Sequence, residues 1–396
     1  MRTYPFFLAS LFFVLVLSFP APARAGGTSP TAVFSFYTVP IKLTYDPGML
    51  IDEPRTLDNV VINSALRQLK RQDLDVLGNQ LQLLRGQIGL NDFLYFRLIE
   101  ATLFNIYRGK SPNARNLTLF QLLADADFDV RLTFRGNRSY VNVYTNEDLF
   151  EVPIIDDDGR TYANITCLNG DCSGKQSLYI AAVQPNPRGR SFSFALRSWP
   201  SMPSRPTVRT VNYTYHGIDH QMDVEFDQNM VDIMKDYPFI DEYCYLDTPL
   251  SPTLARSLVP QLRYLMAPLS TQQRLELLAS FTRSGFAYKE DNDYFGHSKP
   301  MVPEELFGYA YSDCEDRSAL FYALVRELID VPMAVIAFDD HLSIAVATDD
   351  IPGDAFTIGG RRFVFVDPTG PSNSSRIGLI PPGYENKKFE IIGQWK

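Results

Sequence analysis

A single cysteine lies among three carboxylates in the stretch SDCEDRSALFYALVREL, residues 312–328. Ser312 as N-cap and Glu315 three residues later form a capping-box pattern, which places Cys314 in the first turn of a predicted helix. The positive end of the helix dipole lies there and favours the thiolate, so the position suits a nucleophile. Apolar residues at helical spacing predict the buried face behind it: Leu320, Phe321, Leu324, Val325 and Leu328.

The acids beside the cysteine work against a thiolate, because like charges repel. Carboxylates in a first helical turn are also ordinary helix stabilisers. We therefore expect Asp313, Glu315 and Asp316 to face solvent or Arg317 rather than to crowd the thiol.

A structural role for the cysteine is the alternative. Cys167 and Cys172 flank an Asn-Gly turn signal in CLNGDC, which predicts a local loop or disulfide. Cys244 and Cys314 remain, and they either pair with each other or stay as free thiols. A bridge between these two would exclude nucleophilic chemistry at Cys314.

Two later stretches supply the partners that a nucleophilic thiol needs. His341, in FDDHLSIAV, precedes an apolar strand, and an imidazole there can act as base. Asp367, in RRFVFVDPTG, ends the next predicted strand, which Pro368 stops. A cysteine at a helix start, a histidine on one strand and an aspartate on the next can converge into a triad.

These three blocks resemble the Cys, His and Asp blocks of the transglutaminase-like superfamily, which includes secreted bacterial proteins and has a papain-like fold. The resemblance covers about residues 251–385 and implies Cys314 as nucleophile, His341 as general base and acid, and Asp367 as orienting carboxylate. No cofactor and no metal are expected. Two departures concern the substrate groove: Asp340 stands where many relatives have glycine, and Gly370 where close relatives often carry an aromatic.

The resemblance implies acyl transfer through a thioester, and we expect a hydrolase of peptides or other amides. Transamidation is the first alternative. It requires that water be kept from the thioester, which transglutaminases proper do partly with tryptophans, and neither Trp199 nor Trp395 is near the three blocks. A non-enzymatic binding or scaffold protein, with Cys314 bridged to Cys244, is the second alternative.

The N-terminal segment and the net charge indicate where the protein is located and which partners are unsuitable. Residues 1–25 resemble a cleavable signal peptide with a basic start, an apolar core and a cut after Ala25, which predicts a secreted or periplasmic protein. No later segment predicts a membrane span. A formal net charge of -9 argues against nucleic acid as a partner. The resemblance implies a protein or peptide substrate.

Other polar clusters carry weaker signals. His216 and His220, in HGIDH, flank a predicted hairpin turn and lack a third zinc ligand. Asp291 and Asp293, in KEDNDYFGH, offer calcium ligands without the pattern of an EF-hand. His297 follows closely. We expect turn, loop and surface roles for all of them.

The element pattern predicts an α+β protein. Helices are expected within 57–110, with one beginning at Asn91, then at 119–128 and after the N-caps Ser251 and Ser270. Strands are expected as a hairpin over 210–226 and at three later segments: 333–338, 342–347 and 362–366. The predicted division after the signal is an N-terminal α/β region, a β-rich middle domain and the catalytic domain: 26–168, 169–250 and 251–396.

The N-terminal region also resembles a worn copy of the catalytic half. At an offset of 201, residues 119–167 align with 320–368 without a gap, and eight of 49 pairs are identical. Two helix–strand–strand units with shared patterning would give a similar result. As a copy, it carries Asn113, Tyr140 and Thr166 at the positions of the triad and is predicted to be a non-catalytic partner or docking domain.

Overall fold

The computed structural model describes residues 29–396, with gaps at 72–73, 111, 169–171, 173–176, 184–188 and 371–375. The predicted signal peptide and the Asn169-Gly170 turn lie outside the described residues. Helices and sheets are mixed in the chain, so the predicted α+β class is confirmed. No helix among the described residues is long and apolar enough to cross a membrane.

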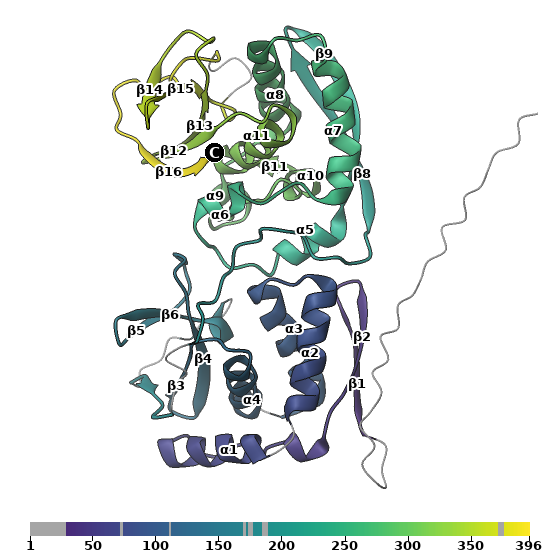
Figure 1. Ribbon diagram of the computed structural model, residues 1–396, viewed down its shortest axis with the longest axis vertical. Coiled ribbons are helices and arrows are strands. Elements are labelled where there is room, and N and C mark those ends of the chain that lie inside the picture. The colour runs from purple at the N-terminus through teal and green to yellow at the C-terminus, as the bar shows by residue number, and fades with distance from the viewer. Residues whose placement is uncertain are drawn as a thin grey trace, which may run out of the picture.

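The described part of the N-terminal half consists of a hairpin, four helices and a five-stranded sheet (Figure 1). The hairpin pairs β1 (Thr31–Phe36) with β2 (Val39–Thr44). The helices are α1 (Asn59–Arg71), α2 (Leu74–Ile88), α3 (Asp92–Ile106) and α4 (Pro112–Asp125). The sheet has the order β5 (Ile154–Asp157), β6 (Arg160–Asn164), β4 (Arg138–Tyr144), β3 (Val130–Arg135) and β7 (Tyr179–Ile180).

Local signals explain where two of these helices begin. The side chain of Asn91 accepts a hydrogen bond from the Leu94 N–H at 2.9 Å and caps α3, as predicted. Helix α4 begins at Pro112, earlier than the predicted residue 119. Proline fits the first helical position because its φ is preset and it needs no hydrogen-bond acceptor there.

The C-terminal half repeats the sequence of hairpin, helices and sheet, with short elements inserted. The hairpin pairs β8 (Pro206–Tyr215) with β9 (Ile218–Asp227). The helices are α5 (Gln228–Met234), α6 (Glu242–Leu246), α7 (Pro252–Met266), α8 (Thr271–Gly285), α9 (Asp291–Tyr294), α10 (Glu305–Gly308) and α11 (Cys314–Leu328). Two short strands, β10 (Ala287–Tyr288) and β11 (Tyr311–Ser312), pair in parallel. The sheet has the order β14 (Ala355–Ile358), β15 (Arg361–Val366), β13 (His341–Ala347), β12 (Met333–Phe338) and β16 (Glu390–Trp395).

The predicted hairpin and helix caps of this half are confirmed. His216 and Gly217 form the two-residue turn of the hairpin with positive φ values of 50° and 76°. Ser251 caps α7 ahead of Pro252. Ser270 and Gln273 form the capping box of α8.

The two sheets have the same strand order, because β5-β6-β4-β3-β7 corresponds to β14-β15-β13-β12-β16 in chain order. In each half the hairpin contacts helices that precede the sheet, and one helix, α4 or α11, contacts the second strand, β4 or β13. Figure 1 shows both halves with the sheet on the left, the helices in the middle and the hairpin on the right. The expected similarity of the two halves therefore extends to their topology.

The gap-free alignment, however, is wrong by two residues across the first two strands. Both hairpins have a two-residue turn, so the pairs Arg135↔Arg138 and Phe338↔His341 correspond, at an offset of 203. Strands β5 and β6 keep the offset of 201 relative to β14 and β15. The residue at the position of His341 is therefore Arg138, and not the predicted Tyr140.

Besides a small hydrophobic cluster on the second sheet, around Phe338 and Phe365, the described residues form two large hydrophobic cores. One joins α1–α4 to the first sheet, and the other joins α7, α8 and α11 to the second sheet and to the β8–β9 hairpin. The segment 169–250, expected as a middle domain, contributes to both: β7 extends the first sheet, and Val211, Val224 and Phe226 lie in the second core. Within the described residues it forms no core of its own.

Candidate active site

Cys314 is the first residue of α11, and its N-cap is Asp313 rather than the predicted Ser312. Ser312 stays extended because it belongs to β11, which pairs with β10. The capping box is accordingly made by Asp313 and Asp316, and the Asp313 N–H donates to Asp316 Oδ2 at 3.1 Å. The shift by one residue keeps Cys314 at the helix N-terminus, where backbone N–H groups lack intrahelical acceptors.

The structure places His341 and Asp367 in contact. His341 begins β13 and its Nε2 lies 3.3 Å from Asp367 Oδ1, just beyond the end of β15. Asp367 is buried, and Thr369 Oγ1 donates to its Oδ1 at 2.7 Å while lying 3.3 Å from His341 Nε2. The ring of Tyr384 lies against the imidazole, with 4.8 Å between centroids. The carboxylate and the tyrosine thus fix the orientation of the imidazole.

Burial alone would raise the pKa of Asp367, yet its pKa is below the ordinary value. Hydrogen bonds from His341 and Thr369 and the charge of Arg283 favour the carboxylate and outweigh the burial. Asp367 is therefore an ionised acceptor for the imidazole. This is the charge state that an orienting carboxylate needs.

Cys314 lies beside the start of the same strand. The backbone N–H of Leu342, the residue after His341, donates to the Cys314 sulfur. The thiol itself donates to Glu315 Oε2 at 2.9 Å. Since Nε2 of His341 is occupied by Asp367, Nδ1 is the ring nitrogen left for the thiol.

The surroundings of Cys314 favour the thiol over the thiolate that the helix N-terminus alone would favour. Burial, and then the charge of Glu315 and its hydrogen bond, raise the pKa of Cys314 well above the ordinary value, and the Leu342 N–H offsets this only in part. The helix dipole is weaker than a carboxylate in direct contact. A raised pKa favours the neutral thiol at Cys314.

The acids around the cysteine do not face solvent as predicted. Asp313 and Asp316 are buried, and Asp316 accepts hydrogen bonds from the N–H groups of Met301 and Asp313. Burial, followed by the charges of neighbouring carboxylates that include Glu315 and Asp291, raises the pKa values of both carboxyls. The contact of the Met301 N–H with Asp316 comes from outside the helix, so statistics for first helical turns do not predict it.

Three of the acidic side chains are close enough for one divalent cation to contact them all. Asp291, Asp313 and Glu315 each have a carboxylate oxygen within 4.8 Å of the others. Asp313 Oδ1 is buried without a hydrogen-bond partner. Asp291 is thus the member of the KEDNDYFGH pair that joins the site, and Asp293 is not in this group.

Arg317 and Thr369 belong to the site and were not among the predicted site residues. Arg317 is buried and donates to the carbonyl oxygens of Thr369, at 2.7 Å, and Phe286. It therefore ties the start of α11 to the segment that follows Asp367. Both residues stand within the motifs CEDR and DPTG, which is the signal that could have identified them.

The other cysteines and histidines have structural surroundings. Cys167 and Cys172 form the predicted local disulfide. Cys244 and Cys314 are both free thiols, so the bridge between them is not formed. His216 lies in the hairpin turn, and His220 stacks on Tyr213 at 5.1 Å between ring centroids.

Comparison with known proteins adds no identification. The chain matches no family model, no curated protein and no solved structure.

Proposed function

We propose that this protein is a cysteine-dependent amide hydrolase, a peptidase or amidase with a transglutaminase-like, papain-like catalytic half. The observation that carries the proposal is the convergence of three separate segments. Cys314 contacts the N–H of Leu342, and the neighbouring His341 lies 3.3 Å from Asp367. These residues have the types and order that nucleophilic catalysis by a thiol requires.

The neutral thiol requires general-base activation. His341 removes the thiol proton as the sulfur attacks an amide carbon, and Asp367 stabilises the imidazolium that forms. The imidazolium then protonates the leaving amine, the C–N bond breaks and a thioester remains. Water attacks the thioester with His341 again as base, which releases a carboxylic acid and restores the thiol. The Cys314 N–H at the helix N-terminus supplies one donor to the oxyanion.

The test is cleavage of a complex peptide library, followed by mass spectrometry of the new chain ends. The wild-type protein is compared with Cys314→Ser and His341→Ala, and Cys244→Ser is the matched control because Cys244 is the other free thiol. We expect products from the wild type and the control and none from the two site variants. The same products from Cys314→Ser, or no products from any form, would refute the proposal.

A primary amine added to the library separates hydrolysis from transamidation. Hydrolysis gives products with free carboxylates, whereas transamidation adds the mass of the amine to an acyl group. We expect free carboxylates at millimolar amine. Amine-bearing products that depend on Cys314 would instead assign a transamidase.

A further inference from the structure

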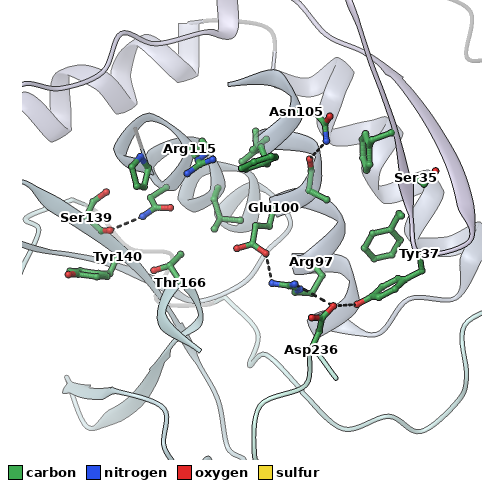
Figure 2. A pocket seen from close by; sticks show the side chains of 18 of the residues that line it. Ser35, Tyr37, Arg97, Glu100, Asn105, Arg115, Ser139, Tyr140, Thr166 and Asp236 are labelled. Atoms are coloured by element: carbon green, nitrogen blue, oxygen red, sulfur yellow. Dashed lines mark hydrogen bonds and ion pairs between the residues drawn. The ribbon is translucent and has the colours of Figure 1, made fainter. Parts of the chain in front are cut away.

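A cavity of about 530 Å³ lies in the N-terminal half, and this volume is within the range of ligand sites. It is lined by the β1–β2 hairpin, by α3 and α4, by the first residues of β4 up to Tyr140, and by Thr166 just after β6. Figure 2 shows Tyr140 and Thr166 at one end, Glu100 and Arg115 between, and Tyr37 with Asp236 at the other end.

The cavity occupies the place that the candidate active site has in the other half. Thr166 follows β6 as Asp367 follows β15, and Arg138 begins β4 as His341 begins β13. Asn113 Oδ1 accepts the Ser139 N–H at 2.9 Å, just as the Cys314 sulfur accepts the N–H of the corresponding Leu342. Asparagine, arginine and threonine cannot replace thiol, imidazole and carboxylate, so the place suits binding rather than acyl transfer.

The charges in the cavity favour an anion. Arg97 is paired with Glu100 at 2.6 Å and with Asp236 at 3.5 Å, and Tyr37 also donates to Asp236. Arg115 and Arg138 also line the cavity, and within the described part of the chain neither forms an ion pair. The charge of Arg115 also acts on Glu100, so Arg115 does not lack an acidic neighbour. The three arginines of the lining nevertheless outnumber its two carboxylates, Glu100 and Asp236.

Both of these arginines lie against aromatic rings. The guanidinium of Arg115 lies 5.2 Å from the ring centroid of Phe104, and that of Arg138 lies 5.8 Å from that of Tyr140. Phe104 is 61% exposed and lines the cavity, so it offers an apolar surface beside the charge. A guanidinium fork matches the geometry of a carboxylate. A ligand that fits both features carries a carboxylate and an apolar side chain close together.

We propose that this cavity binds the C-terminal residue of a peptide, with its carboxylate on Arg115 and Arg138 and its side chain against Phe104. The terminal residue of a chain is the unit of a polypeptide that carries a side chain and a carboxylate on the same carbon. The inference does not rest on the proposed hydrolase activity, since binding can be measured in a protein that lacks Cys314.

The test is a ligand-observed NMR titration of the full chain carrying Cys314→Ser, so that the probes are not consumed. The probes are N-acetyl-alanyl-phenylalanine and the same dipeptide with a C-terminal amide. We expect the acid to bind with a dissociation constant of about 1 mM, in line with the efficiency of small ligands, and the amide at least about tenfold more weakly. Equal binding of the two probes would overturn the proposal.

Variants of the two arginines locate the binding. Arg115→Gln and Arg138→Gln are each expected to weaken binding of the acid at least about fivefold, with Arg115→Lys intermediate because it keeps the charge but not the fork. Arg263→Gln, at an arginine 63% exposed on α7, is the control and leaves binding unchanged. Unchanged binding in both cavity variants refutes the site, provided that circular dichroism shows them folded. Inorganic phosphate that displaces the acid at the same concentration would refute the assignment to a peptide end.

Discussion

The buried guanidinium of Arg317 is predicted to be a main support of the candidate active site. It is 2% exposed and donates to the Thr369 and Phe286 carbonyl oxygens and to Ser312 Oγ at 3.3 Å. Arg317→Met keeps most of the volume and removes every donor. Each buried acceptor that loses its donor destabilises the fold by about 1–3 kcal/mol. Removing the buried charge offsets part of this loss, because the charge no longer has to be desolvated on folding. We expect a net loss of about 2–4 kcal/mol in the free energy of unfolding.

Urea unfolding followed by circular dichroism measures this loss as a lower midpoint for the C-terminal half. Arg263→Met is the matched control, because Arg263 is exposed and lies 3.9 Å from Glu327, a surface pair whose removal costs about 0–1 kcal/mol. A loss at Arg317 no larger than that of the control would refute the reasoning. Because Arg317 also holds Thr369 in place beside His341, folded Arg317→Met should lose Cys314-dependent cleavage as well.

Three further predictions concern charge and covalent links. Burial raises the pKa of Glu304 to about 7, so the fold loses stability as the pH rises from the ordinary carboxyl range to about 7. Glu304→Gln removes this loss, and its stability relative to wild type should increase between pH 5 and pH 8; a constant difference in thermal unfolding would contradict this. The lowered pKa of Asp367 has the opposite sign, because its stabilisation is present above the ordinary carboxyl pKa and disappears as the pH falls through the lower folded value. Asp367→Asn should therefore destabilise the protein more at pH 7 than at pH 3 in urea titrations, and equal effects would exclude the ion pair. Replacing both Cys167 and Cys172 by serine should cost about 2 kcal/mol or less, since the bridge closes a short loop, and a loss above about 4 kcal/mol would contradict the local role.

Local signals predicted the elements whose geometry is set by neighbours in the chain. Asn91, Ser251 and Ser270 cap their helices because the capping hydrogen bonds span only three residues. Ser312 fits the same capping pattern but does not cap α11, because the pairing of β11 with β10 holds it in an extended conformation. The hydrogen bond that Asp316 accepts from the Met301 N–H likewise comes from outside the helix, and no property of the helix itself indicates it.

The wrong assignment of Tyr140 as the counterpart of His341 has a different physical cause. The loop between β4 and β5 runs over residues 145–153, whereas the loop between β13 and β14 runs over 348–354 and is two residues shorter. A slip of two residues leaves the alternation of a strand unchanged, so apolar positions still coincide with apolar positions. Hydrophobic agreement along the strands therefore could not detect the gap, and only the position of the hairpin turn identifies Arg138.

The surroundings of Cys314 also determine what must happen before an amide can be attacked. Its proton is directed to Glu315, and its sulfur receives the Leu342 N–H, so both contacts favour a resting thiol. Transfer of the proton to His341 requires that the thiol turn away from Glu315 toward the imidazole. A substrate amide seated between the helix start and β13 would be well placed to produce this change, because it would exclude water and displace the carboxylate from the sulfur. The proposed hydrolase would then be inert toward solvent and active only with a bound substrate.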